Sequence, residues 1–205
     1  MTFSRNLTAT AALIALSACE LSQEAATNSG FRTPNASGII TGGVDNDGQA
    51  IRRSFSDGAG GGFAFAGGTN DDGLAAFAGI IPATTGGAAL TGDATFSATF
   101  TAYQITGINL SDFGNGEGFI SGQPDIVSDA IQLTADFANG RLTGTSNGGE
   151  LSVNGSFAGT DLGGSVTYLS VGGELDGVIG ADRTVGAFHG NDEDTIFAGG
   201  FVGTP

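Results

Sequence analysis

Hydrophobic and polar residues alternate strictly along one stretch in the middle of the chain. From Leu90 to Ala102 every even position is apolar or glycine, and every odd position is Thr, Ser or Asp. A period of two residues puts the two sets of side chains on opposite faces of a β-strand. The pattern therefore predicts a long strand with one buried face. On that strand we expect Phe96 and Phe100 to be buried and Thr95, Thr99 and Thr101 to face water.

Similar alternation returns in shorter segments up to the C-terminus. Asn139-Gly140 separates two of them and predicts a two-residue hairpin turn, and Asp161–Gly164 predicts another turn. We expect about eight strands joined as a meander, because eight antiparallel strands can close into an up-and-down barrel without exposed edges. The expected strands are 90–102, 104–110, 131–137, 141–145, 151–157, 165–170, 183–189 and 196–202.

Alternation alone fits two kinds of barrel. A membrane barrel turns its apolar residues outward and carries belts of Trp and Tyr, whereas a soluble barrel turns them inward. The chain contains 15 Phe, 2 Tyr and no Trp, so the aromatic belts are missing. We therefore expect an all-β fold: a soluble eight-stranded antiparallel barrel whose apolar interior is filled by Phe alternating with Gly and Ala. A filled interior leaves little room for a small ligand.

The N-terminus shows a different pattern. After Arg5, the apolar segment Leu7–Leu16 is too short to cross a bilayer and is typical of a signal peptide. Leu16-Ser17-Ala18-Cys19 then resembles the lipobox of bacterial lipoproteins, and Cys19 is the only cysteine of the chain. We expect cleavage before Cys19 and a lipid on its thiol. The alternative is an ordinary signal peptide with a chance cysteine. Glu20, in place of an Asp that can retain lipoproteins in the inner membrane, favours delivery to the outer membrane.

Four segments follow from these patterns. Residues 1–18 form the lipoprotein signal peptide, and residues 19–37, without an apolar period, form a lipid-anchored tether. Residues 38–82 contain Gly-rich turns between short apolar pieces, which predicts a β/loop extension. Residues 83–205 form the barrel.

Charge excludes one class of partner. The chain has 21 acidic and 6 basic residues and a formal net charge of −15. Such a surface repels nucleic acid and anionic lipid headgroups, so we expect neither as a partner.

Residues for catalysis or metal binding are scarce. His189 is the only histidine, and it falls on an expected strand, so we expect no catalytic residue and no cofactor. The usual His/Cys zinc sites cannot be assembled. Three acidic clusters, Asp45–Gly48, Asn70–Gly73 and Asn191–Asp194, lack the spacing of calcium loops. Solvated turns are the preferred interpretation of these clusters, with calcium binding as the alternative.

Two segments carry a resemblance to a known family. Ala83–Gly92 is similar to its opening strand, with Leu90 where the family has tyrosine. Gly186–Gly190, followed by Gly199-Gly200-Phe201, is similar to its closing Gly-x-Phe-Tyr-Gly and Gly-Gly-x-Phe pattern, with His189 in place of tyrosine. The family is that of the C-terminal β-barrel domain of transferrin-binding protein B and factor H binding protein. The resemblance covers residues 83–203. An Ala-x-Glu element of the family has no secure counterpart here.

The resemblance implies a non-enzymatic outer-membrane lipoprotein that presents loops to a protein ligand, with an iron or haem carrier among the candidates. A structural envelope lipoprotein without an external ligand is the alternative, and an enzyme ranks third. Asp112–Asp129 joins two expected strands with more residues than a hairpin needs, and long loops and aromatic or Arg anchors favour recognition. The candidate partner-binding residues are Phe113, Phe119 and Ile120 in that segment, and Arg52, Arg53 and Phe55 in the N-terminal part.

Overall fold

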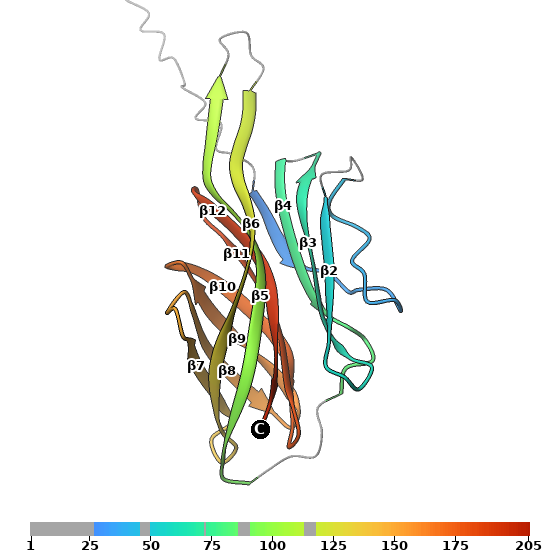
Figure 1. Ribbon diagram of the computed structural model, residues 1–205, viewed down its shortest axis with the longest axis vertical. Coiled ribbons are helices and arrows are strands. Elements are labelled where there is room, and N and C mark those ends of the chain that lie inside the picture. Colours follow the sequence, from blue (N-terminus) through green and yellow to red (C-terminus); the bar gives the residue numbers. More distant parts are fainter. Residues whose placement is uncertain (1–26, 46–49, 72, 86–90, 113–117) are drawn as a thin grey trace, which may run out of the picture.

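The structure is a computed structural model that describes residues 27–45, 50–71, 73–85, 91–112 and 118–205 (Figure 1). None of the described residues belongs to a helix long and apolar enough to cross a membrane. The described strands are β1 (Thr27–Phe31), β2 (Ile51–Ser56), β3 (Gly62–Asn70), β4 (Gly73–Ile80), β5 (Asp93–Asp112), β6 (Gly118–Asp136), β7 (Arg141–Ser146), β8 (Leu151–Ala158), β9 (Asp161–Tyr168), β10 (Val171–Ile179), β11 (Thr184–Asn191) and β12 (Thr195–Thr204).

Eight strands close into a barrel. Each strand from β5 to β12 pairs antiparallel with the next one along the chain, and β12 pairs with β5. The predicted up-and-down barrel is therefore confirmed. The other four strands form a separate sheet in the order β1-β4-β3-β2. We call it the N-terminal sheet.

One strand of the barrel is longer than predicted, because β5 is continuous where the sequence suggested two strands. A bulge lies between Thr106 and Asn109, and Gly107 has a φ of 64°. A glycine in this conformation lets a strand absorb an extra residue and continue. The predicted long loop Asp112–Asp129 is also wrong, since β6 begins at Gly118.

The strand β10 was not predicted, and glycine is the reason. Its inward positions run Val171, Gly173, Leu175, Gly177 and Ile179, so glycine conceals the apolar alternation. A Cβ added at Gly173 would collide with the His189 carbonyl oxygen of β11 and lie 2.8 Å from the ring of Phe197 on β12. Small residues at these positions make room for the large ones of neighbouring strands.

Two predicted turns differ from the observed ones. Asp161–Gly164 is the first half of β9, and the turn between β8 and β9 is formed by residues 159–160, where Gly159 has a φ of 64°. The strand expected at 165–170 ends at Tyr168, because Leu169 and Ser170 form the next hairpin turn, with φ of 49° and 72° that suit a two-residue hairpin. The Asn139-Gly140 turn occurs where expected but spans residues 137–140, with Asp136 paired to Arg141.

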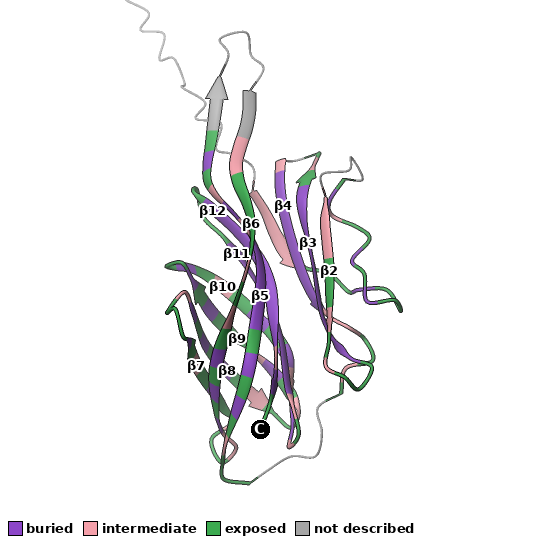
Figure 2. Ribbon diagram, in the orientation of Figure 1, coloured by how far each residue is buried: buried purple, intermediate pink, exposed green. Residues whose placement is uncertain are grey.

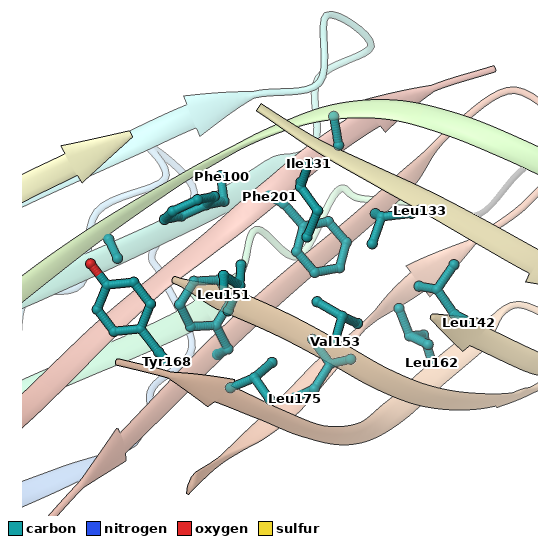
Figure 3. Close-up of a cluster of buried hydrophobic side chains, with 14 of the residues drawn as sticks. Phe100, Ile131, Leu133, Leu142, Leu151, Val153, Leu162, Tyr168, Leu175 and Phe201 are labelled. Carbon is teal, nitrogen blue, oxygen red and sulfur yellow. The ribbon is translucent and has the colours of Figure 1, made fainter. Parts of the chain in front are cut away.

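The interior of the barrel is filled with apolar side chains (Figure 3). Phe96 and Phe100 have no exposed surface, as predicted, and they pack with residues from each of the other strands. The apolar faces therefore point inward, which is the reverse of a membrane barrel. The remaining buried aromatic residues of this cluster are Tyr168, Phe188, Phe197 and Phe201.

The N-terminal sheet packs on the outer wall of the barrel, against β11, β12 and the upper part of β5 (Figure 2). Two aromatic rings lie against glycines at this contact. A Cβ at Gly67 would lie 2.0 Å from the ring of Tyr103, and one at Gly200 would lie 2.4 Å from the ring of Phe63. The glycines therefore allow the two sheets to approach closely.

Because the N-terminal sheet covers part of β5, one prediction about exposed residues of this strand is wrong. Thr95 and Thr99 are exposed as expected, but Thr101 is 6% exposed. Its hydroxyl is hydrogen bonded to the Ser128 hydroxyl at 2.8 Å. Thr101 pairs with Gly200, the residue on which Phe63 of the N-terminal sheet rests, so the outer face of β5 stops meeting water at this level.

An ion pair fixes the lower part of the N-terminal sheet to the barrel. Arg183, before β11, donates to Asp57, after β2, at 3.1 Å, and the Asp57 side chain is 1% exposed. Burial alone would raise the pKa of Asp57. The N–H groups of Ala59 and Gly61 and the Arg183 guanidinium outweigh burial and lower that pKa below its usual value.

The far face of the N-terminal sheet is covered by the segment that precedes β2. Ile40 and Val44 of this segment pack with Phe77 of β4. Residues 19–37 are expected to form a tether, but within them Thr27–Phe31 forms β1, which pairs parallel with β4. An edge strand this short is stabilised by tertiary contacts, so its sequence contains no apolar period from which it could be predicted.

Candidate functional site

The largest departure from a simple barrel is an extension of β5 and β6. Pairing of β12 with β5 ends at Thr195–Thr106, and pairing of β7 with β6 ends at Ser146–Ile131. Beyond these points β5 and β6 pair only with each other and project past the barrel (Figure 1). We call residues 107–112 and 118–129 the ribbon. The hairpin end is the end of the barrel that carries the ribbon and the turns at 147–150, 169–170 and 192–194.

One face of the ribbon base is fixed by packing. Ile105 and Ile108 are buried in the cluster that joins the N-terminal sheet to the barrel. The Ile108 N–H donates to the Asp194 carbonyl at 3.1 Å, and Gly122 leaves room for the Ile105 side chain. The ribbon base therefore stands in a fixed direction.

A side-chain hydrogen bond crosses the mouth of the barrel below the ribbon, above the filled interior. The Tyr168 hydroxyl donates to Gln104 Oε1 at 2.6 Å across the opening. Burial raises the pKa of Tyr168, and the negative charges of Glu150 and Asp125 raise it further. A ligand that meets this end contacts the rim and the ribbon, not the barrel interior.

The free edge of β6 is partly protected against pairing with another strand. The Asn147 N–H donates to the Ala130 carbonyl, so alternation turns the backbone groups of the even-numbered residues of β6 toward this edge. Pro124 has no N–H. The N–H of Ile126 donates to Asp125 Oδ1 at 2.7 Å, and that of Ala130 donates to Asp129 Oδ1 at 2.8 Å. Proline and inward-held carboxylates are the usual protection of an exposed edge.

Negative charge is concentrated at the hairpin end of the barrel. In the described part of the chain, Arg141 and Arg183 lie at the opposite end, and the other arginines belong to the N-terminal sheet and its flanking segments. The ion pairs among described residues leave the rim carboxylates without an arginine partner. These rim carboxylates are Asp125, Asp129, Glu150, Asp192, Glu193 and Asp194.

His189 links β11 to β1. Its Nδ1 lies 3.1 Å from Ser29 Oγ, its Nε2 lies 3.7 Å from a Glu174 carboxylate oxygen, and the Phe31 ring meets it edge-on at 4.4 Å. Ser29 in turn donates to Asn191 Oδ1 at 2.7 Å. Burial lowers the pKa of His189, an effect that Glu174 partly offsets.

The group is not arranged as a catalytic triad. The Ser29 proton is directed to Asn191, so the hydroxyl accepts from His189 Nδ1–H instead of giving up its proton. The 3.7 Å between His189 Nε2 and the Glu174 carboxylate oxygen is too long for a hydrogen bond that would orient the imidazole. The structure thus agrees with the interpretation of His189 as a strand residue. Its contacts attach β1 to the barrel.

Loop carboxylates also gather beside the N-terminal sheet. A shallow open hollow there is lined by Gly43, Val44, Asp45, Asn70 and Asp71. It brings together parts of two of the acidic clusters, whose residues 46–48 and 72 lie outside the described ones. Within the described residues no group of His, Cys, Asp and Glu is placed to hold a metal ion.

The N-terminal candidate residues have three different environments. Arg52 donates to the carbonyls of Ile40 and Val44, both at 3.1 Å, so it holds the covering segment in place. Arg53 is exposed on β2. Phe55 stacks on two phenylalanines of β3, with ring centroids at 4.8 and 5.7 Å, and belongs to the packing of the sheet. Only Arg53 is available to a partner.

The other candidates lie at or beyond the limits of the described residues. Phe119 and Ile120 are on β6, where they pair with Ser111 and Leu110. Phe113 and Cys19 lie outside the described residues. The structure thus places the predicted segment in the ribbon.

The sequence did not reveal the roles of Asp125, Asp129, Ser29 and Asn191, the last of which was counted only in an acidic cluster. Two aspartates four positions apart, the first of them directly after Pro124, are a local sign of a protected edge that could have marked the first two. The contact of Ser29 with Asn191 joins residues that are 162 positions apart, and no local pattern encodes it.

Comparison with known proteins gives distant structural similarities only. No protein-family model matches the sequence, and the search of curated proteins found no match. The apo haemoglobin receptor HpuA from Kingella denitrificans is 15% identical with a TM-score of 0.39, over 70% of this chain and 54% of that one. Isotype 1 transferrin-binding protein B from serogroup B Neisseria meningitidis is 11% identical with a TM-score of 0.44, over 78% of this chain and 36% of that one. The second protein belongs to the family that the sequence motifs resemble. This chain spans about half, or less, of the length of these proteins.

Proposed function

We propose that this protein is a non-enzymatic binding module, anchored to the outer membrane through a lipid on Cys19, that captures a protein partner at its hairpin end. The observation that carries the proposal is the ribbon, two strands that continue past the barrel with no further strand beside them. A filled barrel does not need this extension for its own stability. Exposed, rigidly based elements of this kind are the usual places of recognition.

The chemistry of the hairpin end favours a partner with a basic surface. The rim carboxylates are exposed or half-buried and have no arginine partner, and charges of one sign attract the opposite sign at long range. The partly protected edge of β6 supports recognition through side chains over the addition of a partner strand.

The first test is a pull-down with the chain without its lipid, residues 20–205, which keeps the whole of β1, followed by binding measurements on two charge variants. One combines Asp125→Asn with Glu150→Gln at the hairpin end. The matched control combines Asp93→Asn with Asp161→Asn at the opposite end and removes the same charge. We expect affinity for the captured partner to fall about tenfold in the first variant only. A tenfold change corresponds to about 1.4 kcal/mol of binding free energy.

The alternative function is a structural envelope lipoprotein without an external ligand. Equal effects of the two variants would contradict the assignment of the hairpin end. Failure of intact protein to retain any partner, together with resistance to protease on intact cells, would favour the structural role. Haemoglobin and transferrin are the first ligands to try, because the similar proteins are HpuA, also solved in complex with human haemoglobin, and a transferrin-binding protein.

A further inference from the structure

The point at which the chain enters the described fold lies at the hairpin end. The Asn191 side chain donates to Thr27 Oγ1 at 2.9 Å, and Asn191 is the last residue of β11, next to the turn at 192–194. From Thr27, β1 runs parallel to β4 and away from the ribbon (Figure 1). A tether that precedes Thr27 therefore leaves the molecule beside the ribbon.

This entry point is firmly held. Five residues of β1 pair with β4, and Ser29 is hydrogen bonded to both His189 and Asn191 of β11. Phe31 packs edge-on against His189 at 4.4 Å. The chain is thus fixed to both the N-terminal sheet and the barrel within one short strand.

The tether is short compared with the molecule. Residues 20–26 separate Cys19 from Thr27, which allows a span of about 28 Å when fully extended and about 15 Å for a flexible coil. Asn191 pairs with Ile196 of β12, which in turn pairs with Ile105 of β5, so Asn191 and Ile105 lie in the same register across the sheet. From Ile105 the strand β5 continues about 20 Å to Asp112 in the ribbon and about 40 Å to Asp93 at the opposite end, at roughly 3.3 Å per residue.

These lengths fix an orientation. We propose that the lipidated protein stands with its hairpin end toward its own membrane, so that the ribbon meets its partner in the space between barrel and bilayer. The inference rests on the proposed lipidation of Cys19. The inverted orientation would require the tether to span a distance close to or beyond its full extension. The turns at 137–140, 159–160 and 180–183 then face away from the membrane.

The orientation also limits the kind of partner. A partner of the ribbon must present a basic surface within one tether length of the bilayer. The rim carboxylates themselves disfavour direct contact with anionic headgroups, and this repulsion fades beyond a Debye length of about 8 Å at physiological salt.

Site-specific fluorescence quenching can test the orientation. The lipid occupies the only native thiol, so one engineered cysteine carries the label. Glu193→Cys labels the hairpin end and Ala138→Cys labels the opposite end, both at exposed turn positions. In phosphatidylcholine vesicles with a headgroup quencher, we expect strong quenching at residue 193 and little at residue 138. A Gly/Ser insert of about 30 residues after Glu20, with a coil length near 30 Å, should remove most of the difference.

Two outcomes overturn the inference, and they are distinguishable. Equal quenching at both sites, or stronger quenching at residue 138, in a protein shown to carry the lipid overturns the orientation alone. Absence of palmitate incorporation and of vesicle binding overturns the anchoring, and the orientation with it.

Discussion

Thr99 and Thr101 lie two positions apart on the same face of β5 and have different surroundings. Thr99 is exposed, whereas Thr101 lies under the N-terminal sheet and is hydrogen bonded to Ser128. We expect Thr99→Ala to change the free energy of unfolding by less than about 0.5 kcal/mol, and Thr101→Ala to lower it by about 1 kcal/mol. Urea denaturation measures both. Equal values would show that the sheet does not cover this part of β5.

The inward residues of the same strand provide a larger contrast. Phe96 is fully buried in the barrel. Phe96→Ala should lower the free energy of unfolding by about 3–5 kcal/mol, since a buried ring leaves a cavity. Thr95→Ala is the control on the neighbouring, exposed position. A loss at Phe96 no larger than that at Thr95 would contradict an inward-facing apolar core.

Both tyrosines of the chain are buried and should titrate late. Burial raises the pKa of Tyr103 from 10.0 to about 12, and that of Tyr168 is raised as well. The stability that this contributes is present below pH 10 and is lost as pH rises through the folded-state values. We expect almost no tyrosinate absorbance in the folded protein at pH 10.5, and its sudden appearance when alkali unfolds the chain. A smooth titration near pH 10 would mean that a ring is exposed.

At the scale of single elements, protection of the free edge of β6 against pairing with another strand depends on three residues. Pro124 removes one N–H, and Asp125 and Asp129 occupy two others. Pro124→Thr combined with Asp125→Thr and Asp129→Thr should restore donors to this edge and lead to concentration-dependent dimers, measured by sedimentation. Thr134→Val, on a part of β6 already paired with β7, is the control for added hydrophobicity. A triple variant that stays monomeric would show that the ribbon is protected by other means.

The strands differ in how clearly the sequence predicts them. β5, β6 and β8 alternate apolar and polar residues and were predicted, at least in part. β10 was missed because glycine fills inward positions, and β1 because its side chains contact a distant part of the chain. A strand can be predicted when its own side chains alternate between apolar and polar. It cannot be predicted when the side chains that fill its buried face come from neighbouring strands.

At the scale of the whole molecule, one ion pair joins the N-terminal sheet to the barrel. Asp57→Asn should lower the free energy of unfolding by about 2 kcal/mol at pH 7, since it weakens a buried charged hydrogen bond to Arg183. The pKa of Asp57 is lowered from 3.8, so its contribution is present above that pH and is lost as pH falls through the lower folded value. The difference between the two proteins should therefore shrink below about pH 4. A constant difference down to pH 2.5 would argue against the ion pair.

Attachment to the membrane depends on a single residue in our proposal. Cys19→Ala should prevent incorporation of labelled palmitate and release the protein in soluble form, because one thiol carries the whole anchor. Ser17→Thr, which keeps the thiol, is a control for expression and export. A Cys19→Ala protein that still sediments with membranes, beside a wild type that takes up no palmitate, would contradict the lipoprotein assignment.

The sequence by itself determined the all-β class, the eight-stranded barrel and the inward direction of its phenylalanines. Alternation records, residue by residue, which face of a strand meets the core, so these features are local. Tertiary structure alone decided which outer residues are covered, as at Thr101, and where neighbouring strands stop and leave the ribbon free. It also decided that Thr27 is fixed beside the ribbon. Such features depend on the pairing of segments far apart in the chain, and a local period contains no information about which segment will lie next to it.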